Sequence, residues 1–135
     1  EASNLCTVNF ERDKRRPVRV DNEGKACLDD VALSLQRSSD AKVALVGNEG
    51  TSEQSRRQRE RHDYAAERAL NTKDYLVKEK GIDPSRVLVY TGTDDAKTVT
   101  TTLIPAGATN PVASDTPVDE TPKPVEHHRR RAARK

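Results

Sequence analysis

Apolar residues recur at helical spacing in the middle of the chain. Ala65, Ala69 and Leu76 stand at positions i, i+4 and i+11, which places their side chains on one stripe of a helix. Gly81 occupies the position of a left-handed residue at a helix end, and Pro84 prevents the helix from continuing. The pattern therefore predicts an amphipathic helix that ends before the glycine and is followed by a buried strand.

The other apolar runs predict an α+β fold. Residues 52–63 contain no apolar side chain, so the first part of the second helix is expected to project from the domain. Thr51 and Gln54 have the spacing of a capping box and mark its start. Two helices should therefore cover one face of a mixed four-stranded sheet. The expected order is strand 5–10, helix 22–37 with Asn22 as N-cap, strand 42–47, helix 51–80, and strands 86–91 and 98–104 paired as a hairpin.

The periodic pattern ends at Pro105. Residues 106–126 contain four further prolines among threonine, alanine, valine and acids, which is typical of a disordered linker. A basic tail follows at 127–135. With 33% hydrophobic residues, one Phe and no Trp, the composition is too polar for 135 folded residues. We therefore expect one domain at 1–105 and a Pro-rich disordered linker with a basic tail at 106–135.

Two cysteines lie on faces that are predicted to point inward. Cys6 alternates with Val8 on the first strand, and Cys27 lies beside Leu28 on the inner stripe of the first helix. The strand and the helix should pack face to face, so a disulfide is geometrically plausible, and the alternative is two buried thiols. A small core favours the disulfide, as export of the chain would, and the bond would stabilise the fold by about 3 kcal/mol.

The central helix also resembles a known family pattern. The pattern N-x-x-L-S-x-x-R-A-x-x-V-x-x-Y-L-x-x-x-G-I is typical of domains similar to outer-membrane protein A (OmpA). Six residues match it by type, with one extra residue before the glycine: Arg68, Ala69, Tyr75, Leu76, Gly81 and Ile82. Four depart from it: Arg61, Tyr64, Ala65 and Thr72. The resemblance implies a βαβαββ sandwich that attaches non-covalently to peptidoglycan, in the periplasm of a Gram-negative-type bacterium.

The ligand motif of that family is altered in this chain. In the family, an aspartate after the second strand meets the ammonium of a diamino acid in the stem peptide, and the arginine meets its carboxylate. Gly50 takes the place of that aspartate, and Arg68 takes the place of the arginine. Two carboxylates remain nearby, and Glu53 has the aspartate's place when counted back from Arg68. The resemblance thus implies a ligand site among Asn48, Glu49, Glu53, Arg61 and Arg68.

Other chemistry finds no support in the sequence. His62, His127 and His128 do not have metal-ligand spacing, and no catalytic triad or nucleotide fingerprint occurs. We therefore expect no enzyme activity, no metal and no cofactor. The aliphatic run at 43–46 is too short to span a membrane. The net charge of +2 and the lack of interleaved aromatics predict no specific nucleic-acid partner.

Two alternatives to peptidoglycan binding stay open. In the first, the fold has lost the ligand and acts as a structural or protein-interaction module that contacts other envelope proteins. In the second, the arginines at 56–61 and the basic tail bind polyanions electrostatically. Modest salt would weaken such polyanion binding strongly, whereas it would weaken a zwitterion pocket less.

Overall fold

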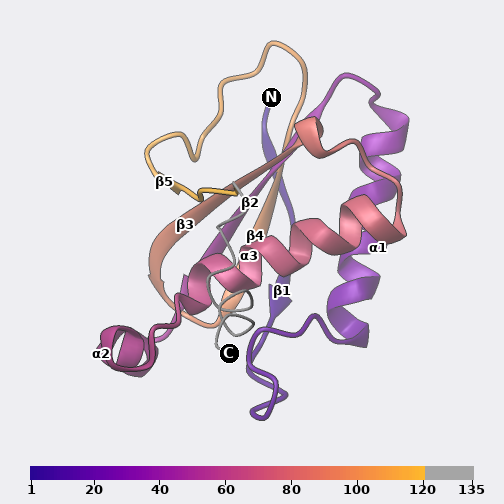
Figure 1. Ribbon diagram of the computed structural model, residues 1–135. Helices are drawn as coiled ribbons and strands as arrows, with labels where there is room; N and C mark the ends of the chain where they lie inside the picture. Colours follow the sequence, from indigo (N-terminus) through magenta and orange to yellow (C-terminus); the bar gives the residue numbers. More distant parts are fainter. Residues whose placement is uncertain (121–135) are drawn as a thin grey trace, which may run out of the picture.

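The protein folds as a sheet with helices on one face (Figure 1). The structure is a computed structural model that describes residues 1–120; the basic tail with His127 and His128 lies outside the described residues. The predicted α+β class is confirmed, with three α-helices and a mixed five-stranded sheet. The helices are α1 (Asn22–Arg37), α2 (Thr51–Glu60) and α3 (Tyr64–Asp74). The strands are β1 (Ser3–Asn9), β2 (Lys42–Glu49), β3 (Val87–Asp95), β4 (Thr98–Ile104) and β5 (Thr116–Pro117).

The strand order is β1-β4-β2-β3-β5, and only β2 and β3 run parallel. The predicted hairpin between β3 and β4 is therefore wrong. Val43 on β2 pairs with Val87 of β3 on one side and with Leu103 of β4 on the other. The short aliphatic β2 is buried on both faces, which suits a central strand. Hairpin signals are local and do not show that a third strand lies between the two runs.

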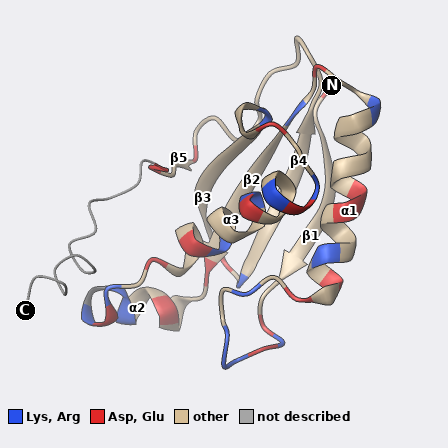
Figure 2. Cartoon of the chain, turned by 45° about the vertical axis from the view of Figure 1, so that its right-hand side comes forward, with Lys and Arg blue, Asp and Glu red and all other residues tan. Residues whose placement is uncertain are grey.

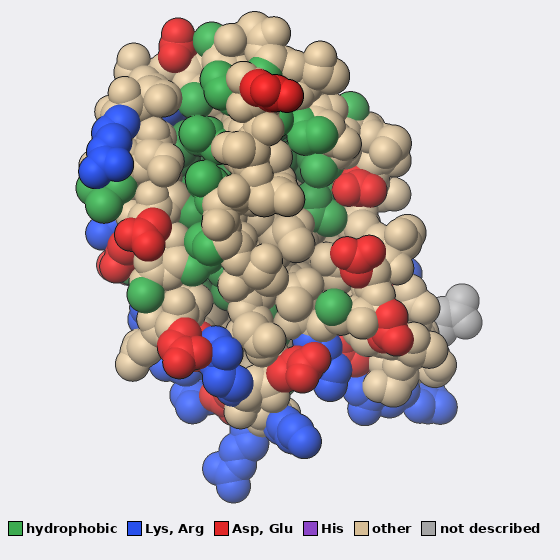
Figure 3. All heavy atoms as spheres, turned by 180° about the vertical axis from the view of Figure 1, so that it is seen from behind, with side chains coloured by type: hydrophobic (Ala, Val, Ile, Leu, Met, Phe, Trp, Pro, Cys, Tyr) green, Lys and Arg blue, Asp and Glu red, His purple; other side chains and the backbone are tan. Residues whose placement is uncertain are grey.

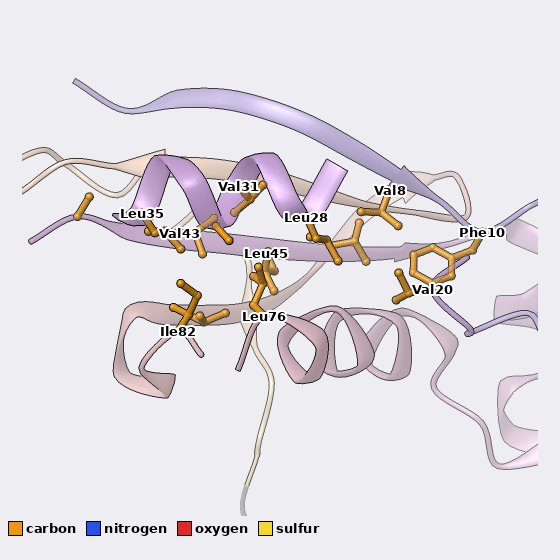
Figure 4. Packing of buried hydrophobic residues seen from close by; sticks show 14 residues of the cluster. Val8, Phe10, Val20, Leu28, Val31, Leu35, Val43, Leu45, Leu76 and Ile82 are labelled. Carbon is orange, nitrogen blue, oxygen red and sulfur yellow. The ribbon is translucent and has the colours of Figure 1, made fainter. Parts of the chain in front are cut away.

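The core lies between the sheet and the two helices that cover it (Figure 4). α1 buries Leu28 and Leu35 against Val43 and Leu45 of β2. Its N-cap is Asp21, one residue before the predicted position, and the Asp21 carboxylate accepts a hydrogen bond from the Gly24 amide at 2.9 Å. Leu76 and Ile82 from the end of the second helical region join the same core cluster.

The predicted disulfide between Cys6 and Cys27 is confirmed. It joins β1 to α1 with a Cα–Cα distance of 6.0 Å, within the normal range for a disulfide. The disulfide thus links the edge strand β1 covalently to α1.

The predicted single helix over 51–80 is wrong, because the chain breaks between α2 and α3. Arg61 adopts a left-handed conformation with φ of 58°, and the Asp63 carboxylate caps α3 by accepting from the Ala66 amide at 3.1 Å. The capping box at Thr51 is also shifted: Glu53 accepts from the Gly50 amide at 2.9 Å. Because α2 has no apolar side chain, packing on the sheet would bury no apolar surface of this helix. α2 therefore projects from the domain (Figure 1).

α3 continues into a π-helical turn at Tyr75–Glu79, where the Lys80 amide donates to the Tyr75 carbonyl at 3.2 Å. The extra residue relative to the family pattern falls in this turn. A π-turn takes up one inserted residue while the helix on either side keeps its register. Leu76 and Gly81 therefore keep their roles as core residue and positive-φ helix end.

The chain after β4 returns along the far edge of β3. β5 pairs with Tyr90 and Thr91, and the Val118 amide donates to the Val89 carbonyl at 3.0 Å. Lys73 on α3 forms an ion pair with Glu120 at 2.8 Å. The sequence pattern did not predict this short strand. The domain boundary at residue 105 stays a prediction, which truncation can test.

Candidate functional site

The site lies where β2 ends and the chain turns into α2. α3 packs very closely on β2 here, because Gly47 has no side chain: a Cβ at this position would lie 2.0 Å from the Ala65 carbonyl oxygen. This close approach lets Arg68 on α3 reach the end of β2, which Asn48 and Glu49 form, and the start of α2. The glycine is therefore required by packing and not by its own backbone conformation.

Arg68 is completely enclosed, with an exposed fraction of 0%. Its Nη1 and Nη2 donate to the two oxygens of Glu53 at 2.8 and 2.6 Å. Nη1 also donates to the Asn48 carbonyl at 3.1 Å, and Nε donates to the Pro17 carbonyl at 3.0 Å. The guanidinium thus joins α3 to the start of α2, to the end of β2 and to the loop before α1.

Two aromatic rings complete the enclosure of the guanidinium. Its Cζ lies 5.6 Å from the ring centre of Phe10 and 5.5 Å from that of Tyr64, which is cation–π distance. Tyr64 precedes Arg68 by one helical turn, so its position follows from the sequence. Phe10 and the Pro17 carbonyl come from a distant segment, and no local pattern indicates them.

Glu53 is buried with Arg68 and also caps α2. Burial alone would raise the pKa of its carboxyl, but the hydrogen bonds from Arg68 and from the Gly50 amide, together with the positive charge of Arg68, lower it below the usual value. The carboxylate therefore stays ionised and is held from two sides. This pair joins two of the charged residues that the family resemblance picked out.

Glu49 forms a second, more open ion pair beside the first. Its side chain is 3% exposed, and Oε2 accepts from Nη2 of Arg57 on α2. The Arg57 side chain is 45% exposed, so solvent reaches the cation of this pair but not the anion. The two pairs thus differ in how easily a ligand could replace one partner.

The other candidate residues take different places. The Asn48 side chain is buried and joins the ends of neighbouring strands, accepting from the Asp94 amide at 3.3 Å and donating to Thr98 at 3.4 Å. Arg61 is exposed at the C-terminal end of α2. Asp95, which the sequence did not single out, accepts from the Thr51 amide at 2.8 Å and supports the start of α2.

Three further observations concern the rest of the described residues. Within residues 1–120, no cluster of three histidine, cysteine or acidic side chains could hold a metal ion. In the same part of the chain, no helix has the length and apolar character needed to cross a membrane. A groove of about 750 Å³ opens between residues 16–20 and α3, lined by Val18 and Tyr75 among others, but Arg68 does not line it.

Comparison with known proteins places this geometry in context. The model of the OmpA family matches residues 9–122. Among solved structures, the OmpA-like domain of FopA1 from Francisella tularensis subsp. tularensis SCHU S4 is similar, with a TM-score of 0.59 and 17% sequence identity. The match covers 77% of this chain and 74% of that chain, and it shows a shared fold. The comparison with curated proteins gives no match.

Proposed function

This chain belongs to the OmpA family, whose domains are non-catalytic modules of the bacterial cell envelope, and we propose that it binds peptidoglycan non-covalently through the stem peptide. The observation that carries the proposal is the pair of Glu53 and Arg68. An acid and an arginine meet at the end of β2, fifteen residues apart, although glycine has replaced the acid of the motif itself. The chain has thus kept one anion and one cation at the place where the family receives a zwitterion.

The proposed ligand site takes in five residues. The buried pair of Glu53 and Arg68 forms its base, with Asn48 and Glu49 at the end of β2 and Arg61 at the C-terminal end of α2. We place the domain in the periplasm of a Gram-negative-type bacterium, where peptidoglycan and other envelope proteins are its partners.

A second function is favoured by the complete burial of Arg68. Four N–H groups of its guanidinium donate to acceptors within the protein, so the fold holds this arginine without a ligand. A domain that has lost peptidoglycan binding would keep this pair for stability alone. It would then act as a structural or protein-interaction module.

A third function is favoured by the uneven charge. Residues 11–19 and 51–61 carry nine basic and four acidic side chains, whereas the rest of 1–120 carries nine and seventeen. Figure 2 colours stretches of α2 and of the loop after β1 as Lys and Arg, and Figure 3 shows Lys and Arg side chains gathered mostly at the lower end of the molecule. This end could attract a polyanion without any specific pocket.

Sedimentation with purified insoluble peptidoglycan, at low and at moderate salt, tests the proposal. A zwitterion pocket predicts that the protein sediments at both salt concentrations. Protein that stays in the supernatant at both would favour the second function. Protein that sediments only at low salt would favour the third, because electrostatic binding of polyanions weakens steeply with salt.

A further inference from the structure

The groove between residues 16–20 and α3 is a separate place on the molecule. Its volume of about 750 Å³ is within the range of small-molecule sites. The loop after β1, the start of α1, and α3 with the π-helical turn that follows it all contribute to its lining. α1 and α3 cover the same face of the sheet (Figure 1). None of the five residues of the proposed peptidoglycan site lines this groove.

Hydrogen bonds hold the walls of the groove in place. Nδ2 of Asn71 on α3 donates to the Val18 carbonyl at 2.7 Å, which fastens the loop to the helix. The Tyr75 hydroxyl donates to the Asp29 carboxylate of α1 at 2.7 Å, which links the π-helical turn to α1. A ligand therefore meets a preformed groove, so binding does not have to order these walls.

Part of the lining is apolar. Val20 is 8% exposed, whereas Val18 and Tyr75 are only partly buried. Tyr75 begins the π-helical turn, and Lys78 and Glu79 of the same turn also line the groove. Such turns are frequent at functional sites. The apolar body of a ligand would be stabilised against Val18 and the Tyr75 ring, because both still expose apolar surface to water.

The charged part of the lining is cationic on balance. Four of the lining residues are basic and two are acidic. Two of the basic residues already have close partners, since Lys78 pairs with Asp74 at 3.3 Å and Arg16 pairs with Asp13 at 2.8 Å. The charge that remains favours an anionic ligand.

The other two basic residues, Arg19 and Lys25, are available to that ligand. Arg19 is 42% exposed and lies 4.0 Å from Asp13, which is too long for a hydrogen bond. Nζ of Lys25 lies 5.9 Å from the ring centre of Tyr75. In the part of the chain that the structure describes, no carboxylate lies within ion-pair distance of this Nζ. Both cations can therefore take an acidic group without giving up a close ion pair.

We propose that the groove binds a small amphipathic anion, with its carboxylate or phosphate head on Arg19 and Lys25 and its apolar body against Tyr75. A guanidinium pairs bidentately with either kind of head, and the ammonium adds a point charge. The chain's own segment after residue 120 does not suit the groove, because it carries six basic residues and one acidic residue. An anion without an apolar body, or an apolar molecule without charge, would use only one part of the lining.

Titrations followed by amide NMR spectra test the proposal with four probes. Octyl phosphate and octanoate carry both an acidic head and an apolar chain, whereas octanol lacks the charge and inorganic phosphate lacks the chain. Both alkyl anions should shift the amide signals of Val18, Lys25 and Tyr75 until the site is saturated. Octanol and inorganic phosphate should bind at least about tenfold more weakly, because each loses either the charge-assisted hydrogen bond or the buried chain.

Single substitutions locate the two parts of the ligand. Lys25→Gln and Arg19→Gln should each weaken binding of octyl phosphate about tenfold, because each removes one cation from the head. Val18→Asn should weaken it by a similar factor through the apolar chain. Lys14→Gln is the matched control and should bind like the wild type, since Lys14 is exposed on the same loop as Arg19 but does not line the groove. Unfolding midpoints show whether each variant is folded.

Several results would overturn the proposal. Equal affinity for octyl phosphate and inorganic phosphate, or equal losses in Lys14→Gln and Lys25→Gln, would indicate general charge attraction instead of a groove site. Equal affinity for octyl phosphate and octanol would exclude the contacts to the head. Shifts confined to α2, or no saturable shift with either alkyl anion, would exclude the groove itself. None of these outcomes depends on peptidoglycan, so the test is independent of the proposed function.

Discussion

Glu53 and Arg68 form a buried, bidentate ion pair in which both carboxylate oxygens accept from the guanidinium, at 2.8 and 2.6 Å. The pair joins two helices that the sequence pattern presents as one. It also fixes the end of β2 through the Asn48 carbonyl. Its position makes it the anchor of α2, the helix that buries no apolar side chain of its own.

The first prediction concerns the stability that this pair provides. Arg68→Ala leaves a buried carboxylate without its cation, so the free energy of unfolding should fall by about 3–5 kcal/mol. Urea unfolding monitored by circular dichroism measures the change. Arg59→Ala, on the exposed side of α2, should change it by less than about 0.5 kcal/mol. An Arg68→Ala protein as stable as the wild type would show that the pair is dispensable.

The second prediction concerns the pH dependence of the same contact. Because the pKa of Glu53 is lowered from 4.5, its stabilising effect is complete above about pH 4.5 and is lost as the pH falls through its folded pKa. The stability difference between the wild type and Glu53→Gln should therefore be largest near neutral pH and shrink toward about pH 3. Urea midpoints across this range measure it. A difference that stays constant would mean that folding does not lower the pKa of Glu53.

The family resemblance pointed to both members of this pair, but not to their burial. The separation of fifteen positions from Glu53 to Arg68 agrees with the family pattern, which is why both were candidates. The resemblance implied an arginine that meets a ligand, and the structure encloses its side chain. The enclosing groups include the ring of Phe10 and the carbonyl of Pro17, which belong to the first forty residues and which helical periodicity around Arg68 cannot show.

In the fold, too, features set by local sequence were predicted, and features set by distant contacts were not. The apolar stripe, the glycine at the helix end and the inward cysteines each follow from a local pattern, and the structure agrees. The break at Arg61 was missed because arginine carries no signal for a left-handed conformation, which glycine or asparagine usually adopts. The position of β2 between β3 and β4 depends on pairing across the whole domain.

A third prediction concerns the bond between Cys6 and Cys27, which closes a loop that spans 21 positions of the sequence. Replacing both cysteines by serine should lower the free energy of unfolding by about 3 kcal/mol. A matching fall should appear when the wild type is unfolded with a reductant present, while the double variant should not respond to the reductant. Equal midpoints with and without the reductant would contradict a stabilising role for the disulfide.

The fourth prediction tests the domain boundary at residue 105. Truncation after Gly107 removes β5 and the ion pair of Lys73 with Glu120, but it leaves the core untouched. The shortened protein should still unfold cooperatively. We expect a loss of about 1 kcal/mol, which lowers the midpoint by about 4–8 °C in a domain of this size. Non-cooperative unfolding would place the boundary beyond residue 107.

The central claim is that a zwitterion site, and not general charge attraction, holds this domain on peptidoglycan. Competition at constant ionic strength tests it most directly. Protein sedimented with insoluble peptidoglycan is titrated with the soluble tripeptide that ends in diaminopimelate, and in parallel with the tripeptide whose side-chain amine is acetylated. The account predicts that the unmodified peptide releases the protein and that the acetylated peptide needs an about tenfold or higher concentration. Release by added salt but by neither peptide would contradict it.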